Sequence, residues 1–380
     1  MYTLQPNLKL GRDVWDHVNM PAEEFAGRIE RLTAAMRRRK LDALLLYGNL
    51  VNDYGNPAYV SNYLLRMSRG AVVILTHSAE ATLIFEGIPR GIHMAEQVCA
   101  VGDIRAGRNM AAESVKVLQE KKLLPGKIGL VGVRHLMPHD QARQFYADLG
   151  ADNVVHADDL VRKQRSVKSR REQDQIRRAS RIVANAFKVL LEQPVAVMTP
   201  KAIEARLIRE ARMDGAEDIR VAVGIPGMGN WSLAPAEPIA LTDGAAVIVL
   251  MAVENERYWS ETLRTLVVRG NHLEVAPIAD LEPLWQQFGK ALRPGRKTGE
   301  IHQEMVAAMA GLKWVAEYGL GEGVGLGPYE EPTLAAGGAV ALKEGMCLSI
   351  RLIVEDATLG AVAVGDTVLI GKGGAEPLRG

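Results

Sequence analysis

The chain has few of the features that place a protein in an extreme class. Its two cysteines, Cys99 and Cys347, lie far apart in 380 residues and make no disulfide framework. The formal net charge of +1 gives no bias toward nucleic acid or an anionic membrane. No apolar run reaches the roughly 20 residues that span a bilayer, and the first residues carry charges where a secretory signal is apolar. We therefore expect a cytoplasmic protein without nucleic-acid or membrane partners.

Hydrophobic residues make up 48% of the chain, enough to bury the cores of two domains. In the first part, helical patterns at 21–36, 110–122 and 140–150 alternate with short apolar runs typical of buried strands. Those runs occupy residues 41–48, 70–76, 81–85 and 127–132. This alternation predicts an α/β domain with an open sheet over residues 1–160.

The remaining residues, 161–380, predict a different architecture. The Lys- and Arg-rich stretch 162–181 lacks interleaved aromatics and continues into an amphipathic helix, so a solvated face is favoured over a nucleic-acid surface. Thr199 and Pro200 then begin a second helix as N-cap and first-turn residue. Strands are predicted at 219–224, 245–253 and 257–270, and helices at 275–292 and 298–311. We expect helices outside a curved, mostly antiparallel sheet whose concave face is available for a ligand.

Four segments, 243–270, 318–332, 342–354 and 360–370, resemble in sequence and order the pita-bread family. This family contains methionine aminopeptidases, proline aminopeptidases, prolidases and creatinase. The resemblance implies an α+β fold in which a pita-bread domain, residues 161–380, follows a smaller creatinase-like α/β domain, residues 1–160. It also implies a homodimer, because creatinase and prolidase share their sites between two chains.

In the metal-using members of this family, five positions hold Asp, Asp, His, Glu and Glu around two divalent cations. The matching residues here are Leu250, Glu261, Glu322, Arg351 and Gly365. Leucine and glycine offer no donor atom, and a guanidinium has no lone pair for a metal. The two carboxylates and one guanidinium that remain are close to charge balance without metal. We therefore predict no metal and no cofactor.

Histidine is also missing from the positions where the family uses it. Creatinase is metal-free and uses a histidine, whose position is matched here by Ser232 or Leu233. The histidine of the family's His-Glu-x-Pro segment is Tyr329. Six of the eight histidines precede residue 160, and the others, His272 and His302, fall on predicted outer helices. The creatinase mechanism is therefore not expected to transfer.

The predicted catalytic residues are Glu261, Glu322, Tyr329 and Arg351. Two nearby carboxylates do not both ionise easily, so one holds a proton and acts as a general acid. Arg351 binds a substrate carboxylate or stabilises developing negative charge. The alternative is that Arg351 pairs with both glutamates and plugs an inactive site.

Five further residues are candidates for substrate binding: Arg66, Arg69, Trp231, Glu330 and Glu331. The resemblance suggests that the two arginines reach into a partner subunit's pocket, and a surface position at a strand edge is the alternative. Trp231 either walls the pocket or packs in the core. The two glutamates either face the pocket or face solvent.

Three functions are compatible with these residues. The first is a metal-independent hydrolase or lyase for a small amide-, guanidine- or amino-acid-like substrate. The second is a catalytically silent binding module, since some relatives in eukaryotic assemblies use this fold to bind proteins. The third is an Xaa-Pro-type peptidase, which is disfavoured because no ordinary two-metal centre assembles from these residues.

Overall fold

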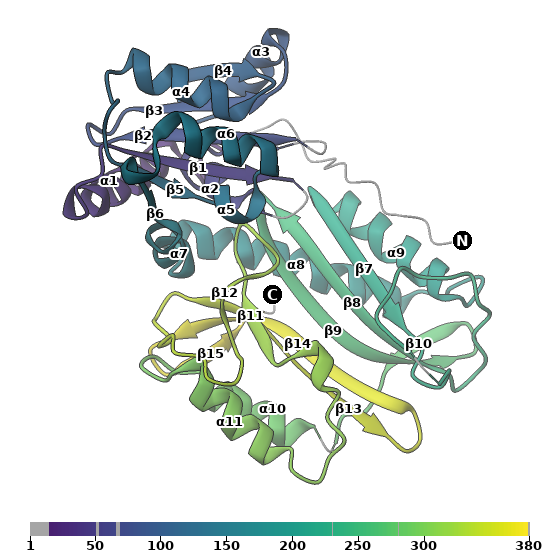
Figure 1. Cartoon of the computed structure of the whole chain (residues 1–380). Coiled ribbons are helices and arrows are strands. Elements are labelled where there is room, and N and C mark those ends of the chain that lie inside the picture. The colour runs from purple at the N-terminus through teal and green to yellow at the C-terminus, as the bar shows by residue number, and fades with distance from the viewer. Residues whose placement is uncertain (1–14, 51–52, 66–68, 230, 280, 379–380) are drawn as a thin grey trace. The chain divides into compact units, whose positions relative to one another are not determined.

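The computed structural model describes residues 15–50, 53–65, 69–229, 231–279 and 281–378, and two compact units divide between Arg165 and Ser166 (Figure 1). The division falls at the end of helix α7 (Asp158–Ser166). Within the described ranges, no helix combines the length and the apolar character needed to cross a bilayer. Each unit has its own sheet.

The N-terminal unit is built on a six-stranded sheet with the order β4-β3-β2-β1-β5-β6. The sheet is mixed, because β1, β2 and β3 are antiparallel neighbours while the outer pairs are parallel. Its strands are β1 (Ala43–Asn49), β2 (Gly70–Thr76), β3 (Ala81–Glu86), β4 (Asp103–Gly107), β5 (Ile128–Val131) and β6 (Val154–His156). The four strands predicted from apolar runs are β1, β2, β3 and β5. The half-exposed strands β4 and β6 have no such signal.

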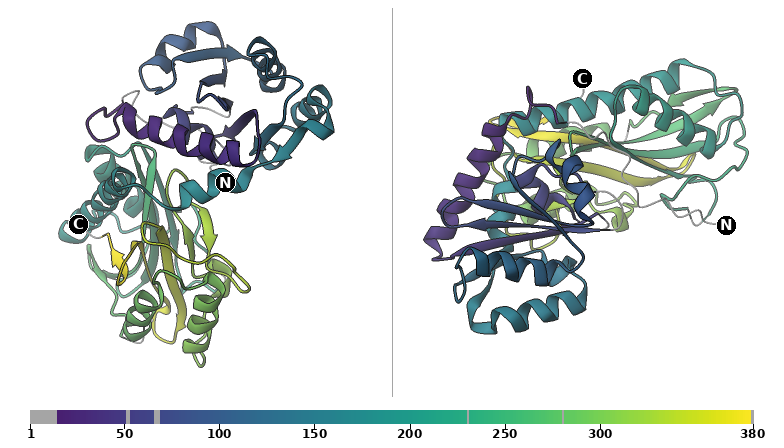
Figure 2. Two further views of the ribbon diagram at one scale, coloured as in Figure 1. Left: turned by 90° about the vertical axis from the view of Figure 1, so that its left-hand side faces the viewer. Right: turned by 90° about the horizontal axis from the view of Figure 1, so that it is seen from above.

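Helices cover both faces of this sheet. Helices α4 (Met110–Glu120) and α6 (His139–Leu149) pack on one face through a shared apolar cluster that includes Leu45, Val72 and Phe145. Helix α1 (Ala22–Arg38) lies on the other face (Figure 2). Short helices complete the unit: α2 (Gly55–Ser61), α3 (Ile92–Glu96) and α5 (Val133–Leu136). The sheet is therefore buried on both sides, which explains why its central strands are apolar throughout.

The C-terminal unit contains a nine-stranded antiparallel sheet with the path β12-β11-β13-β14-β9-β8-β7, to which β10 and β15 add at β9 and β14. The strands on this path are β7 (Asp218–Gly224), β8 (Ala246–Asn255), β9 (Tyr258–Arg269), β11 (Gly321–Gly323), β12 (Glu330–Thr333), β13 (Cys347–Asp356) and β14 (Gly360–Gly371). The additional strands are β10 (His272–Val275) and β15 (Gly374–Pro377). The α+β pita-bread fold predicted from the sequence is confirmed.

Four helices cover one face of this sheet. Helices α8 (Arg170–Glu192) and α9 (Pro200–Met213) pack against β7, β8 and β9. Helices α10 (Glu282–Ala291) and α11 (Thr298–Ala308) contribute to a second core with β13 and β14. We call the opposite side, which carries Ile248, Leu263 and Ile353, the inner face. The candidate site lies there.

Local sequence signals account for the main boundaries. Ser169 and Glu172 form a capping box that begins α8. Thr199 caps α9 with Pro200 at its first turn, and these two roles were predicted from the sequence. The two-residue turn between β8 and β9 places Glu256 and Arg257 at positive φ, 45° and 69°, which is typical of a tight hairpin.

The prediction of a helix over 275–292 was wrong in its first part. Residues His272–Val275 form strand β10 on β9, and α10 begins only at Glu282. Pro283 at the first turn explains the late start, because proline is tolerated there and disfavours a helix continuing from before it. His272 is therefore an exposed strand residue instead of a helical one. His302 lies on α11 as predicted, edge-on to Trp314.

Candidate active site on the inner face of the large sheet

The strand register gathers polar side chains on the inner face. Ala252 of β8 pairs with Glu261 of β9, and Ser349 of β13 lies between Thr367 of β14 and Glu322 of β11. The backbone N–H of Glu261 donates to Thr367 Oγ1 at 2.9 Å. This bond connects the pair Ala252–Glu261 to the residues Thr367, Ser349 and Glu322, so that the five form one row across the sheet. Because cross-strand partners project to the same side of a sheet, both glutamates point to the inner face.

Arg351 lies between the two glutamates. It is two residues along β13 from Ser349 and therefore shares the inner face. Its Nη1 donates to Glu261 Oε1 at 3.2 Å, and its Nη2 donates to Glu322 Oε1. The residues are largely buried, with 7% of Arg351 and 4% of Glu261 exposed. The structure thus brings together three of the four predicted catalytic residues, from strands β9, β11 and β13.

Glu261 has the more unusual environment of the two glutamates. Burial raises the pKa of its carboxyl above the ordinary value, and the neighbouring Glu322 adds to this effect. Arg351 and the hydroxyl of Ser349, which donates to Glu261 Oε1, oppose it. Glu261 Oε2 is buried and has no hydrogen-bond partner among the described residues. The carboxyl therefore lacks a hydrogen-bond donor at its second oxygen within the described part of the chain, and the raised pKa favours a proton on the carboxyl.

The charges of Arg351 and Tyr329 follow from the same neighbours. Burial alone lowers the pKa of Arg351, but Glu261 and Glu322 outweigh it and the net shift is upward, so the guanidinium stays charged. Desolvation of the Tyr329 hydroxyl, together with the charge of Glu261, raises its pKa. Much of the Tyr329 side chain is exposed, but its hydroxyl lies close enough to Glu261, Arg351 and Glu322 to sense their charges, and the raised pKa keeps it protonated as a hydrogen-bond donor.

One end of the inner face is apolar. Leu250, Leu263, Ile248 and Ile353 form a cluster against which Trp231 packs. The Trp231 ring stacks on Tyr318 with a centroid separation of 6.1 Å, and the Tyr318 hydroxyl accepts from the backbone N–H of Leu233 at 2.9 Å. Trp231 is therefore a half-buried wall of the inner face, and the apolar Leu250 lies where the family's first metal ligand is expected.

The structure does not place the other predicted binding residues beside Glu261, Glu322 and Arg351. The Glu330 carboxylate is buried against Lys168 Nζ at 3.1 Å and accepts from the Gly327 backbone N–H at 3.0 Å, which is a structural role. Glu331 is exposed. Arg66 lies outside the described residues.

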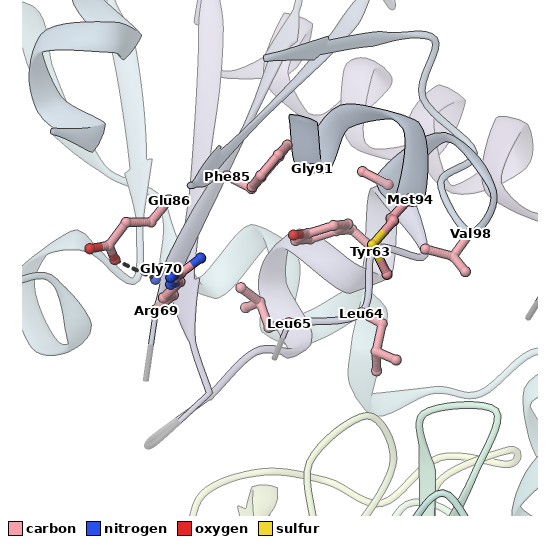
Figure 3. Close-up of a pocket in the computed structure, with 11 residues that line it drawn as sticks. Tyr63, Leu64, Leu65, Arg69, Gly70, Phe85, Glu86, Gly91, Met94 and Val98 are labelled. Atoms are coloured by element: carbon pink, nitrogen blue, oxygen red, sulfur yellow. Dashed lines mark hydrogen bonds between the residues drawn. The ribbon is translucent and has the colours of Figure 1, made fainter. Parts of the chain in front are cut away.

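Arg69 belongs to the N-terminal unit, where it lines a cavity of about 190 Å³ with Tyr63, Phe85 and Met94 (Figure 3). The neighbouring Gly70 N–H donates to Glu86 Oε2 at 3.0 Å in the same cavity. The predicted reach of Arg69 into a partner subunit, like the homodimer itself, stays a prediction.

Two residues of the inner face were not predicted from the sequence. Ser349 contacts Glu261 directly, and its only sequence signal is its position two residues before Arg351 on the same strand. Arg220 of β7 pairs with Ala252 and so extends the row of Glu261 by two strands. An alternating pattern in residues 218–224, with Ile219, Val221 and Val223 in the core, marks Arg220 as facing the other side.

The two-metal centre of the family does not fit these residues. Only two carboxylates remain, and the guanidinium of Arg351 lies between them. A side chain at Gly365 has no room, because a Cβ there would lie 3.0 Å from Leu263 Cβ and 2.9 Å from the Ile350 carbonyl oxygen. Across the described ranges, no three His, Cys, Asp or Glu side chains are placed to share a metal ion.

The fold matches that of a known enzyme family. The chain belongs to metallopeptidase family M24, whose sequence profile matches residues 174–372. The creatinase/prolidase N-terminal domain profile matches residues 28–167. Membership supports a hydrolase of the peptidase kind as the general class.

Similar proteins add detail. A Xaa-Pro dipeptidase from Pyrococcus horikoshii is 25% identical over 278 residues, 71% of this chain and 78% of the dipeptidase. The agropine synthesis cyclase of Rhizobium rhizogenes is 38% identical over 90 residues, 23% of each chain.

Two solved structures share the fold. The X-Pro aminopeptidase of Thermotoga maritima has a TM-score of 0.76 at 19% identity, covering 93% of this chain and 97% of that one. The N-terminal domain of the FACT complex subunit SPT16 from chickpea has a TM-score of 0.67 at 14% identity, covering 94% of this chain and 96% of that one.

Proposed function

We propose that this protein is a hydrolase or lyase that breaks a C–N bond in a small amide-, guanidine- or amino-acid-like substrate without a metal ion. The observation that carries the proposal is the guanidinium of Arg351 between the carboxylates of Glu261 and Glu322. It supplies a positive charge between the buried Glu261 and the half-buried Glu322, and it has no lone pair for a metal. The general class of hydrolase has independent support from the family.

The two glutamates are suited to different proton transfers. Glu261 is buried, has a raised pKa and holds an unpartnered oxygen, which are the properties of a general acid. Glu322 is half-buried and contacts Arg351, so it is the better placed of the two to take a proton from water. Two carboxyl groups in different environments, one buried and one more exposed, commonly serve as the acid and the base of an enzyme.

The hydrolytic step balances with these two groups. The oxygen of water adds to the carbon of the C–N bond, Glu322 takes the proton that water loses, and Glu261 gives its proton to the departing nitrogen. In an elimination, Glu322 instead removes a proton from the neighbouring carbon. The Tyr329 hydroxyl donates a hydrogen bond to the oxygen that gains charge. Proton exchange with solvent then restores both carboxyl groups.

The relatives suggest which substrates to test first. The name of the Pyrococcus protein indicates a dipeptide, and that of the Rhizobium protein indicates ring closure. Ring closure uses the same acid–base pair when the nucleophile belongs to the substrate instead of to water. Dipeptides, N-acyl amino acids, their amides and guanidino acids therefore form the first panel.

The test measures release of amine or ammonia from this panel. The purified protein is compared after dialysis against a strong chelator, with and without added manganese. We expect turnover that the chelator leaves unchanged and that Glu261→Gln and Arg351→Met abolish, while the exposed control Glu344→Gln retains it. Activity that disappears with chelator and returns with manganese contradicts the proposal.

A second candidate function is a silent binding module. It is favoured by the same contacts, because Arg351 and the two glutamates satisfy one another's charges without a substrate. The likeness in fold to the SPT16 domain shows that this architecture occurs in a subunit of a larger complex. The binding module is supported if the protein turns over no member of the panel and Arg351→Met changes only the stability of the protein.

A further inference from the structure

We propose that Arg220 is the specificity-determining residue of this site and binds a carboxylate group of the substrate. The inference rests on the proposed function in one respect: it takes the inner face around Glu261 as the place where substrate binds. It goes beyond that function by restricting the substrate to molecules with a carboxylate a few bonds from the C–N bond.

The strand register places Arg220 on the same face as Glu261. Arg220 pairs with Ala252, and Ala252 pairs with Glu261, so the three side chains form one row across β7, β8 and β9. Neighbouring strands are about 4.8 Å apart, which separates the backbones of Arg220 and Glu261 by roughly 10 Å. The residue between them has only a methyl group. Ala252 therefore adds no polar or charged group between Arg220 and Glu261.

The guanidinium of Arg220 is held in position by an aromatic ring. Its Cζ lies 4.8 Å from the ring centroid of Trp259, a fully buried residue on β9. A guanidinium at this distance is attracted by the electron-rich face of the ring and can still donate from its N–H groups. Arg220 is exposed, and among the described residues it makes no ion pair. Its donors are therefore available to an anion.

Arg351 is less suited to this role. Its two terminal nitrogens already donate to Glu261 and Glu322, so one cation faces two carboxylates and the set carries no excess positive charge when both are ionised. Arg220 adds a positive charge beside this set, and its field reaches the Tyr329 hydroxyl. A planar fork of N–H donors matches a carboxylate in two-point contact. Together these features orient a substrate with its carboxylate on Arg220 and its reactive bond toward Glu261.

The experiment compares carboxylates with their primary amides. Glycyl-proline, N-acetylglycine and guanidinoacetate are each titrated into the full-length protein by calorimetry beside glycyl-prolinamide, N-acetylglycinamide and guanidinoacetamide. We expect wild type to bind at least one acid more tightly than its amide. Arg220→Met should weaken binding of that acid roughly 10- to 100-fold and leave the amide unchanged, because it removes a charge-assisted contact but keeps an unbranched side chain.

Controls separate binding from folding. Arg181→Met, an exposed arginine on α8, should bind like wild type, and Arg220→Lys should recover part of the affinity because it keeps the charge without the fork. Melting temperatures show whether Arg220→Met remains folded. The proposal is overturned when no acid binds wild type better than its amide, or when Arg220→Met keeps the wild-type ratio. If the protein prefers acids but turns none of them over, the proposed hydrolysis is refuted and the carboxylate site at Arg220 is retained. If turnover occurs and Arg220→Met leaves it unaffected, the carboxylate site is refuted and the proposed hydrolysis is retained.

Discussion

Replacement of Arg351 by methionine tests the buried charge cluster directly. The guanidinium is the shared partner of Glu261 and Glu322, and methionine fills much of its volume without a charge. Removal of one partner from a buried ion pair costs about 3–5 kcal/mol, because the remaining charge loses its compensation. We expect the free energy of unfolding of the C-terminal unit to fall by about this amount at pH 8.

The loss should depend on pH in a defined direction. Without Arg351, the pKa of Glu261 rises further, since the cation that lowers it is gone. A carboxyl group with a raised folded-state pKa stabilises the fold fully below its unfolded pKa, near 4.5, and this contribution is lost as the pH rises through the folded-state pKa. The destabilisation of Arg351→Met should therefore grow between pH 5 and pH 8, by at most about 1.4 kcal/mol per pH unit for each proton.

Calorimetric and urea unfolding at several pH values measure this effect. The two compact units are followed separately, because a two-unit chain need not unfold in one step. Arg181→Met, which removes an exposed arginine, is the matched control and should stay within about 0.5 kcal/mol of wild type. An Arg351→Met protein as stable as wild type at pH 8 refutes the charged cluster on which the proposed chemistry depends.

Three further predictions address neighbouring features. The glutamine of Glu261→Gln cannot titrate, so the stability of this variant relative to wild type should improve as the pH rises above about 4.5. Urea midpoints measure the effect, and a stability difference that does not change with pH contradicts the raised pKa of Glu261. Burial raises the pKa of Cys99 and Cys347 to about 12, so a disulfide reagent should label neither thiol in the native protein at pH 8 and both after unfolding; rapid native labelling disproves their burial. In Gly224→Ala, the new Cβ would lie 2.7 Å from Trp231 Cε3, so the ring must shift and stability should fall by about 1–3 kcal/mol, with altered near-UV circular dichroism; unchanged spectra argue against the packing.

The sequence alone determined much of this protein. Apolar runs, the cap of α9 and four ordered segments were sufficient for the fold, because these signals are local or follow chain order. The identities of Leu250, Glu261, Glu322, Arg351 and Gly365 also predict an altered metal centre. The helix over 275–292 failed in its first part, where Val275 instead completes a strand on β9. A short edge strand has too few residues for a periodic signal.

Tertiary structure decided how the remaining groups are used. Glu330 lies beside the site in sequence, yet it pairs with Lys168, 162 residues away. Arg220 carries no motif, and only the register of β7 on β8 and of β8 on β9 places it in the row of Glu261. The protonation of Glu261 likewise depends on burial by distant segments. Cross-strand register and desolvation are properties of the assembled sheet, because each depends on residues far apart in the chain, and so neither is encoded in any single segment.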